Sequence, residues 1–229
     1  MFLSRILLTN YRNFRHMELR LPPGLVFILG DNGVGKTNLL EAAYILSIAK
    51  SYRTNVEREL VNWHGQKQWG ETSHVSDLND EQTIIDGEVE RQRGKLRIII
   101  GLRVTSSDGN TGGRMVKKQV RANGRAITVG GLVGLINAVL FTANDIELVH
   151  GPPARRRRFL DILISQVDGK YMASLQRYQR ILSQRNHLLR LIRAGRSTAD
   201  ELYFWDTEIV KEGSILSSRR EDVVEKLNP

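Results

Sequence analysis

Apolar and polar residues alternate in two short segments near the N-terminus, Ser4–Thr9 and Met17–Leu21, and this period of two predicts β-strands. The run Leu25–Leu29 is apolar without interruption, which is typical of a strand buried on both faces. A loop punctuated by glycines follows, and Lys36–Ala49, rich in Leu, Ala and Ile, is expected to be a helix. The pattern therefore predicts the order strand, tight loop, helix.

Strand-like patterns return between residues 83 and 129. The predicted strands are Thr83–Glu90, Lys95–Thr105, Met115–Ala122 and Ala126–Val129. Asn123-Gly124 is a strong hairpin signal, because both positions of this turn need a positive φ. We expect these strands to form an antiparallel sheet layered on the first unit. Gly130–Asn137 is then expected to be a short helix and Ala138–Thr142 another buried strand.

The pattern becomes helical from Gly151 onward, where Pro152-Pro153 suits a helix start. Apolar residues then recur at a 4-3-4-3 spacing that is typical of a coiled-coil seam, with Arg185 at the one polar position. These residues are Tyr171, Leu175, Tyr178, Leu182, Leu189 and Ile192. Gly195 is expected to end this helix.

A capping box of Thr198 and Glu201 is predicted to open the next helix. Its apolar side consists of Leu202, Trp205, Ile209, Leu216, Val223 and Leu227. The sequence therefore predicts two domains, a lobe over residues 1–150 and a helical arm over residues 151–229 that contains a hairpin of two long helices.

Charge is concentrated in this arm. The chain has 34 basic and 25 acidic residues and a net charge of +9, and the segment 151–197 alone holds 11 basic residues and two acidic ones. Arginine, whose planar guanidinium suits phosphate oxygens, outnumbers lysine by 25 to 9. A local excess of this kind favours a polyanion such as nucleic acid as partner, with a solvated helical face as the alternative.

Composition excludes several other classes. The chain has no cysteine, which rules out disulfides and thiolate chemistry, and its five histidines show no metal-ligand spacing. No apolar run approaches the roughly 20 residues of a membrane span, and residues 1–14 lack a signal-peptide pattern. We therefore expect a cytoplasmic protein without a membrane partner.

The loop before the predicted helix matches the phosphate-binding pattern G-x-x-x-x-G-K-[ST]. It reads Gly30, Asp31, Asn32, Gly33, Val34, Gly35, Lys36 and Thr37. Its glycines let backbone N–H groups surround a phosphate, the lysine can reach the β- and γ-phosphates, and the Thr37 hydroxyl can ligate Mg²⁺. The sequence therefore predicts a site for ATP and Mg²⁺.

A complete hydrolytic site also needs an acidic residue for Mg²⁺ at the end of a second strand. Asp86 follows two isoleucines but lies in polar surroundings, and Asp145 lies beyond the expected strand end, where a turn cap is the favoured interpretation. We therefore assign no catalytic residue and expect ATP binding without appreciable hydrolysis.

Three segments resemble the RecF family of bacterial DNA-repair ATPases, which have an ABC-type head like that of SMC proteins. They are Leu8–Phe14 with Leu40-Glu41-Ala42, Ser51-Tyr52-Arg53, and Asn144–Asp161, which is similar to the family's G-x-P-x-x-R-R-x-[FY]-L-D signature. The family usually has proline where Ala143 or Asn144 stands. The resemblance spans the whole chain.

This resemblance implies an α/β fold: a P-loop NTPase of ABC-ATPase-head type with an antiparallel β layer and a helical-hairpin arm. It implies a slow ATPase that forms an ATP-dependent homodimer, binds single-stranded, double-stranded and gapped DNA, and works with RecO and RecR to load RecA in recombinational repair, replication restart and the SOS response. RecF proteins are bacterial and nucleoid-associated. Their C-terminal part carries the ABC signature and Walker B motifs, which we do not find in this chain.

The resemblance also suggests further site residues. Arg12 and Asn13 lie in the turn where SMC-like heads touch the nucleotide, although exposed turn residues are the alternative. Candidate DNA contacts are Arg53, Arg155, Arg156, Arg157, Arg158, Arg177 and Arg180. Because successive helical residues are about 100° apart, two of the four consecutive arginines are expected to face DNA and the others to pair with acids such as Asp161. A head of another SMC-like coiled-coil ATPase, or a P-loop kinase or transferase, remains an alternative.

Overall fold

A computed structural model describes residues 1–62, 82–92, 94–106 and 114–228. The chain divides into two compact units, Met1–Val139 and Leu140–Pro229. Residues 140–150 belong to the second unit, in which Glu147 forms an ion pair with Arg155 at 2.5 Å. Among the described residues, no helix is long and apolar enough to cross a membrane.

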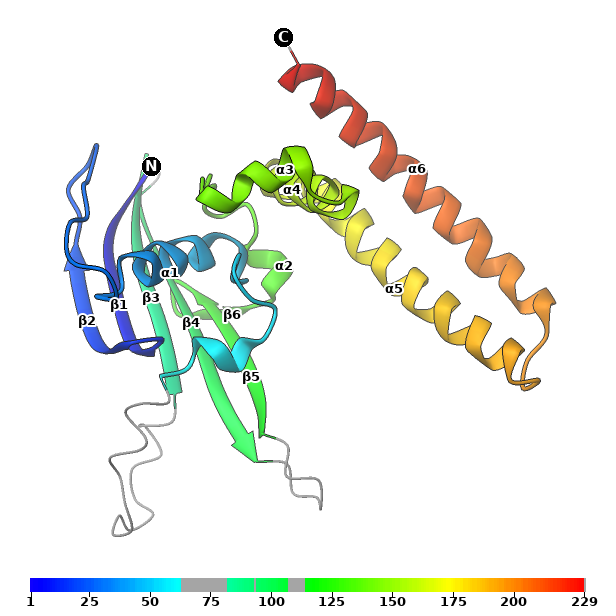
Figure 1. Ribbon diagram of the computed structural model, residues 1–229, viewed down its shortest axis with the longest axis horizontal. Coiled ribbons are helices and arrows are strands. Elements are labelled where there is room, and N and C mark those ends of the chain that lie inside the picture. The colour runs from blue at the N-terminus through cyan, green and yellow to red at the C-terminus, as the bar shows by residue number, and fades with distance from the viewer. Residues whose placement is uncertain (63–81, 93, 107–113, 229) are drawn as a thin grey trace. The chain divides into compact units, whose positions relative to one another are not determined.

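The first unit contains one six-stranded antiparallel sheet with the order β2-β1-β3-β4-β5-β6 (Figure 1). Its strands are β1 (Phe2–Tyr11), β2 (Phe14–Arg20), β3 (Gln82–Arg91), β4 (Gly94–Ser106), β5 (Arg114–Ala122) and β6 (Arg125–Ile127). These six predicted strands are therefore confirmed, but they form one sheet, because β1 pairs directly with β3. The Asn123-Gly124 hairpin is also confirmed, with φ of 48° and 80°.

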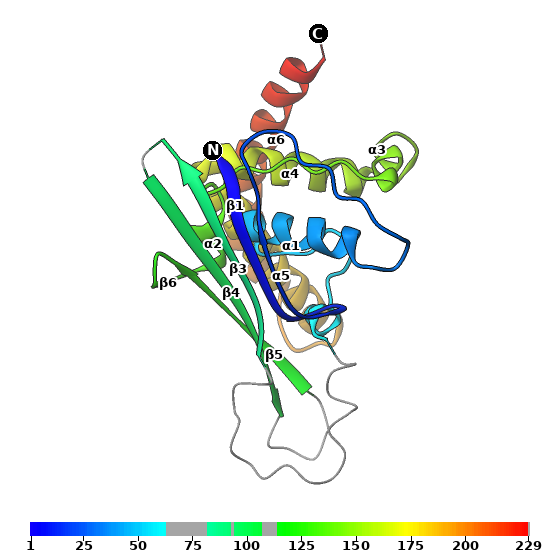
Figure 2. The same ribbon diagram turned by 90° about the vertical axis from the view of Figure 1, so that its left-hand side faces the viewer.

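Helix α1 (Lys36–Ile48) lies across one face of this sheet (Figure 2). Leu39, Ala42, Ile45 and Leu46 pack against buried side chains of β1, β3 and β4. The approach is close at Gly87, where an added Cβ would lie 2.3 Å from a methyl carbon of Leu46. The core thus fixes α1, and with it the loop that precedes the helix.

Two predicted buried strands are wrong. Leu25–Leu29 and Ala138–Thr142 are irregular, and Leu25, Leu29, Val139 and Phe141 are 80%, 88%, 71% and 80% exposed. A strand needs a neighbouring strand, and within the described ranges neither run belongs to the sheet or to an isolated bridge. The remaining short elements are η1 (Glu57–Leu60) and α2 (Val129–Leu132), the latter being shorter than the helix expected over 130–137.

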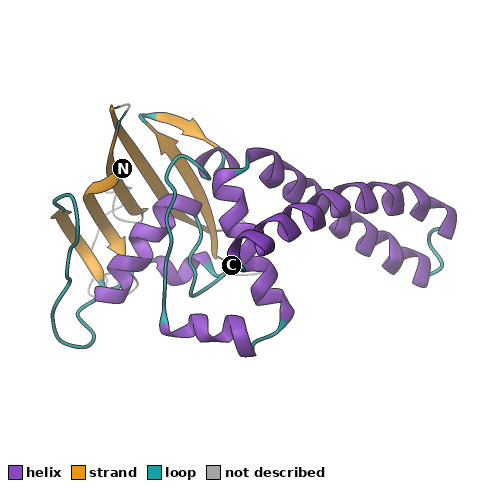
Figure 3. Cartoon of the chain, turned by 90° about the horizontal axis from the view of Figure 1, so that it is seen from above, coloured by secondary structure: helices purple, strands orange, loops and turns teal. Residues whose placement is uncertain are grey.

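The second unit is helical. It contains η2 (Ala143–Ile146), α3 (Glu147–His150), α4 (Pro153–Val167), α5 (Gly169–Arg193), η3 (Ala199–Glu201) and α6 (Leu202–Leu227). Helices α5 and α6 run side by side as the predicted hairpin (Figures 1 and 3). The proline start of α4 and the Thr198–Glu201 capping box are confirmed, and Gly195 follows α5 with a φ of 68°.

Five of the seven predicted seam positions of α5 are buried or partly buried, namely Tyr171, Leu175, Tyr178, Arg185 and Ile192. Ser174, Ile181 and Leu188 are also buried or partly buried. The predicted Leu182 and Leu189 are exposed instead, as is Leu227 of α6. Apolar residues occupy both 181–182 and 188–189, so the sequence allows either residue of each pair to be buried, and packing against α6 selects one.

The packing of α1 leads to a stability prediction. Replacing Leu46, which is 1% exposed, by Ala should lower the free energy of unfolding by about 2–5 kcal/mol, because the change leaves a cavity under the helix. Leu40 lies on the same helix but is 48% exposed, so Leu40→Ala should cost less than about 1 kcal/mol. Urea unfolding followed by circular dichroism measures both, and equal losses would contradict the described packing.

Candidate functional site

The loop Gly30–Gly35 has the backbone that its glycines allow. Gly30, Gly33 and Gly35 have φ of 151°, 88° and 110°, in the region that other residues rarely adopt. Gly35 also faces the turn between β1 and β2, where a Cβ would lie 2.5 Å from the Phe14 ring and 2.8 Å from the amide nitrogen of Asn13. Both its φ and this close approach require a residue without a side chain.

Lys36 begins α1, and its side chain turns back toward the loop. Its Nζ donates to the carbonyl oxygens of Gly30 at 2.6 Å and Asp31 at 2.8 Å, so the ammonium lies within the loop. The next residue, Thr37, is exposed, and its hydroxyl has no partner among the described residues. The first turn of α1 contains no acidic side chain, which leaves its positive end available to an anion.

The turn between β1 and β2 lies against the loop through Asn13. The Asn13 amide donates to the carbonyl of Val34 at 3.2 Å, and its oxygen accepts from Asn38 at 2.8 Å. The structure therefore brings Asn13 to the phosphate loop. Asp31, Asn32, Gly33 and Val34 themselves are exposed.

Arg12 has its guanidinium bound to a carboxylate of α1. Its Nε and Nη2 donate to the two oxygens of Glu41 at 3.0 and 2.8 Å, while its backbone has a φ of 51°. An arginine in this conformation is strained, and the bidentate pair holds it there. The side chain of Arg12 is thus anchored to α1 in the first unit.

Glu41 is fully buried and collects further donors. Tyr11 donates its hydroxyl at 3.0 Å, Ser51 donates a short hydrogen bond, and the guanidinium of Arg53 lies 3.6 Å away. A buried carboxylate is stable only with such partners. Glu41 therefore ties the β1–β2 turn and the segment after α1 to the helix that carries Lys36.

The sequence analysis did not assign Glu41 a role. Its signals in the sequence are its place in the Leu40-Glu41-Ala42 segment of the family resemblance and its position among apolar neighbours, in Leu39-Leu40-Glu41-Ala42-Ala43. Arg53, predicted as a DNA contact, also donates to the side-chain oxygen of Asn38 at 2.7 Å. The structure therefore places Arg53 against α1, at Asn38 and Glu41.

These contacts set the ionisation of Glu41. Burial opposes the charged form, but the hydrogen bonds from Arg12 and Ser51 outweigh it and lower the pKa of Glu41 below its usual value of 4.5. Burial and the neighbouring carboxylate together raise the pKa of Tyr11. Near neutral pH the pair is a carboxylate held by a guanidinium and a neutral phenol.

Both acidic candidates from the sequence are bound to groups of their own unit. Asp86 belongs to the face of β3 opposite Gly87 and α1, where Arg97 holds it at 2.7 and 3.0 Å and Arg5 at 3.3 Å. Asp145 accepts from the backbone N–H of Thr142 at 2.5 Å and from its hydroxyl at 3.1 Å, as a turn cap does. No cluster of three metal-ligating side chains occurs within the described ranges.

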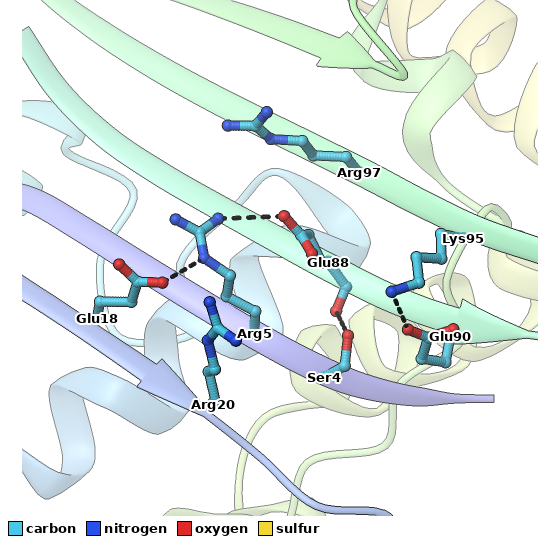
Figure 4. Close-up of a pocket in the computed structure, with 8 residues that line it drawn as sticks. All are labelled: Ser4, Arg5, Glu18, Arg20, Glu88, Glu90, Lys95 and Arg97. Atoms are coloured by element: carbon cyan, nitrogen blue, oxygen red, sulfur yellow. Dashed lines mark hydrogen bonds and ion pairs between the residues drawn. The ribbon is translucent and has the colours of Figure 1, made fainter.

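The face that carries Asp86 holds a shallow pocket lined by Ser4, Arg5, Glu18, Arg20, Glu88, Glu90, Lys95 and Arg97 (Figure 4). Its charges largely neutralise one another. Arg5 pairs with Glu18 at 2.6 Å and with Glu88 at 3.3 Å, and Lys95 pairs with Glu90 at 3.0 Å. We interpret these pairs as cross-strand stabilisation of the sheet.

The arginines of the second unit differ in their contacts. Arg155 pairs with Glu147, and Arg156 donates to the carbonyls of Leu148 at 3.3 Å and Gly151 at 3.0 Å. Arg177 is bound to both carboxylate oxygens of Glu212 at 2.5 and 3.1 Å. Arg157, Arg158 and Arg180 are exposed.

Asp161, which the sequence offered as a partner for the arginine run, pairs instead with Arg220 at 2.8 Å and accepts from Tyr171. Such a partner, which is 59 residues away in the chain, cannot be read from local spacing.

Glu41 leads to a prediction on stability and pH. Glu41→Gln should lower the free energy of unfolding at pH 7 by about 3 kcal/mol, near the lower end for a broken buried pair because glutamine still accepts hydrogen bonds. Since the pKa of Glu41 is lowered by folding, its contribution is complete above about pH 4.5 and is lost as the pH falls through the folded value. Urea unfolding between pH 7 and pH 3 should show the difference shrinking in acid.

Glu59→Gln is the matched control, because Glu59 is exposed in the same unit. It should leave the free energy of unfolding within about 0.5 kcal/mol of the original at each pH. A difference for Glu41→Gln that stays constant down to pH 3 would contradict the assigned ionisation.

Comparisons with known proteins agree with this geometry. A family described as the AAA ATPase domain matches residues 1–123. The DNA replication and repair protein RecF of Roseiflexus castenholzii is 37% identical over 233 residues, which cover all of this chain and 57% of that protein. RecF of Bacillus subtilis is 36% identical over 198 residues, covering 86% of this chain and 47% of its own.

Solved structures of RecF proteins are also similar to this chain. The recombination mediator protein RecF with ATP, of the RecFOR pathway, superposes on 99% of this chain with a TM-score of 0.82 at 30% identity, over 54% of that protein. The corresponding RecF structure with ATPrS gives a TM-score of 0.81 at 29% identity, over 99% of this chain and 55% of that protein. The likeness supports the predicted ABC-ATPase-head fold.

The chain spans about half the length of the curated relatives that it matches. The matching segment includes the phosphate loop, the Glu41 contacts and the helical hairpin, since it covers the whole of this chain. The resemblance noted in the sequence is thus confirmed: the chain belongs to the AAA ATPase domain family, and over its full length it is similar to about half of the length of RecF proteins.

Proposed function

We propose that this chain binds ATP with Mg²⁺ at the loop Gly30–Thr37, as the nucleotide-binding part of a RecF-type DNA replication and repair ATPase. The observation that carries the proposal is the loop itself, in which Lys36 Nζ lies among backbone carbonyls at the start of α1. The two similar RecF structures are described with ATP and ATPrS, which supports a nucleotide at the same loop.

The residues of the loop fit the phosphates. The three left-handed glycines and the start of α1 supply N–H groups, and Lys36 supplies a cation. The Thr37 hydroxyl, exposed and without a partner among the described residues, suits a Mg²⁺ ligand. Bound Mg²⁺ would offset phosphate charge. Asn13, held against Val34 and Asn38, keeps the β1–β2 turn next to this loop.

The role that we propose for Arg12 differs from the nucleotide contact expected from the sequence. Because Glu41 holds its guanidinium, we propose that Arg12 positions the Asn13 turn, while nucleotide contact falls to Gly30–Thr37 and Asn13. We assign no residue of this chain to catalysis of hydrolysis. ATP hydrolysis by this chain is expected to stay near background, and a slow ATPase is expected only of a complete dimer.

DNA is the polyanion that we propose for the basic second unit. The exposed Arg157 and Arg180 are better placed for phosphate contacts than Arg155 and Arg177, which are paired with Glu147 and Glu212. By analogy with the RecF family, we propose that a complete protein dimerises on ATP, binds single-stranded, double-stranded and gapped DNA in the bacterial nucleoid, and works with RecO and RecR in RecA loading and SOS induction. The RecFOR pathway named for the RecF structures supports this assignment.

The phosphate site gives a direct test. Lys36→Ala should weaken binding of a fluorescent ATP analogue at least tenfold, because it removes the cation that faces the phosphates, and Thr37→Ala should remove most of the Mg²⁺ dependence of binding. Lys50→Ala, which removes the same charge from an exposed position just beyond α1, is the control and should bind like the unsubstituted chain. Unchanged affinity in Lys36→Ala would overturn the proposal, and hydrolysis well above that of Lys36→Ala would show that a catalytic acid is present.

A further inference from the structure

Helix α5 has an unusual charge composition. Its 25 residues include six basic side chains and no aspartate or glutamate. Its hairpin partner α6 carries six acidic and four basic side chains over 26 residues. The two helices therefore present different charges, although they share one seam.

Some of these arginines form ion pairs across the seam between α5 and α6. Arg177 is bound to Glu212, which is almost fully buried, and Arg185 pairs with Asp206 at 2.6 Å. Hydrogen bonding from Arg177 lowers the pKa of Glu212 despite its burial. These two ion pairs stabilise the hairpin and neutralise both arginines.

The opposite side of α5 has no such partners. We call this surface the α5 outer face and define it by the exposed residues Gln176, Gln179, Arg180, Ser183, His187 and Arg190. Arg180 makes no hydrogen bond or ion pair with any described residue, and Arg190 donates only to the carbonyl of Asn186, one turn earlier, at 3.1 Å. Both guanidinium groups thus lack a carboxylate.

The neutral side chains of the α5 outer face are also suited to contacts with phosphate groups. Amide and hydroxyl groups donate to phosphate oxygens in protein–DNA complexes alongside arginine. From Gln176 to Arg190 the face extends for about 21 Å at the helical rise of 1.5 Å per residue, enough to lie along several consecutive phosphates. A face that serves only for solubility commonly mixes both signs of charge, as α6 does.

We infer that the α5 outer face binds the sugar–phosphate backbone of duplex DNA, without reading base sequence, with Arg180 and Arg190 as its two charged contacts. This inference deepens the proposed function and rests on it. It replaces Arg177, which the hairpin uses, by Arg190, which the sequence analysis did not single out as a DNA contact. The outer side of α6 is expected to take no part.

The test measures the affinity of the full 229-residue chain for a fluorescent duplex of mixed sequence over a range of salt concentrations. Arg180→Gln/Arg190→Gln should weaken binding at low salt and reduce the slope of log K against log salt by about 1.8, because each phosphate that the protein neutralises contributes about 0.9. A duplex of different sequence should show the same weakening. Glutamine keeps the helix propensity, so circular dichroism should be unchanged.

Lys211→Gln/Lys226→Gln is the matched control, because it removes the same charge from exposed positions of α6. It should leave the slope within about 0.5 of the original. Equal weakening in both double variants would overturn the inference, because net charge alone would then explain binding, and so would an unchanged slope in the α5 variant. Absence of binding by the unsubstituted chain at low salt would instead overturn the proposed DNA function, and the inference with it.

A second measurement locates the DNA independently of charge. Since the chain has no cysteine, Ser183→Cys on the α5 outer face and Ser218→Cys on the exposed side of α6 each create a single labelling site. An environment-sensitive fluorophore should respond to duplex DNA at position 183 and not at 218. The same response at both positions, or a response at 218 alone, would overturn the assignment to α5.

Discussion

The buried carboxylate of Glu41 is the constraint on which the nucleotide end of the first unit depends. A buried charged group must be compensated by nearby hydrogen-bond donors or opposite charges. Tyr11 and Arg12, which precede the phosphate loop in the chain, and Ser51 and Arg53, which follow α1, compensate Glu41. The loop lies between these anchored segments. Its position is therefore set by an ion pair inside the protein as well as by its glycines.

The two units use their charges for different purposes. In the first, four arginines are paired with carboxylates, including Arg12 with Glu41 and Arg97 with Asp86, and the loop holds the Lys36 ammonium against its backbone. In the second, acids on α6 neutralise the arginines of the seam and leave those on the other side of α5 without carboxylates. The basic side chains thus include some that form structural ion pairs and some, as on the α5 outer face, that remain exposed.

Local patterns predicted what depends on neighbouring residues. Alternation located β1 and β2, strand-like patterns located β3 to β6, the Asn123-Gly124 turn predicted the β5–β6 hairpin, and the proline and Thr198–Glu201 signals located helix starts. Sequence patterns failed where the conformation or packing of a segment depends on a partner that is distant in the chain. Leu25–Leu29 has no neighbouring strand among the described residues, and at 181–182 and 188–189 of α5 either residue could be buried until α6 selected one.

The candidate site likewise contains one feature that local sequence predicts and others that depend on distant residues. The spacing of its own residues predicts the phosphate loop, whereas the role of Glu41 depends on Arg12, 29 residues away, and that of Asp161 on Arg220, 59 residues away.

Hydrogen exchange of the backbone amides, with and without ATP and Mg²⁺, tests the central claim most directly. The account predicts increased protection at residues 30–37 together with residues 11–13, because Glu41 and Asn13 join the two segments. Protection of neither segment, or of residues 30–37 alone, would contradict it.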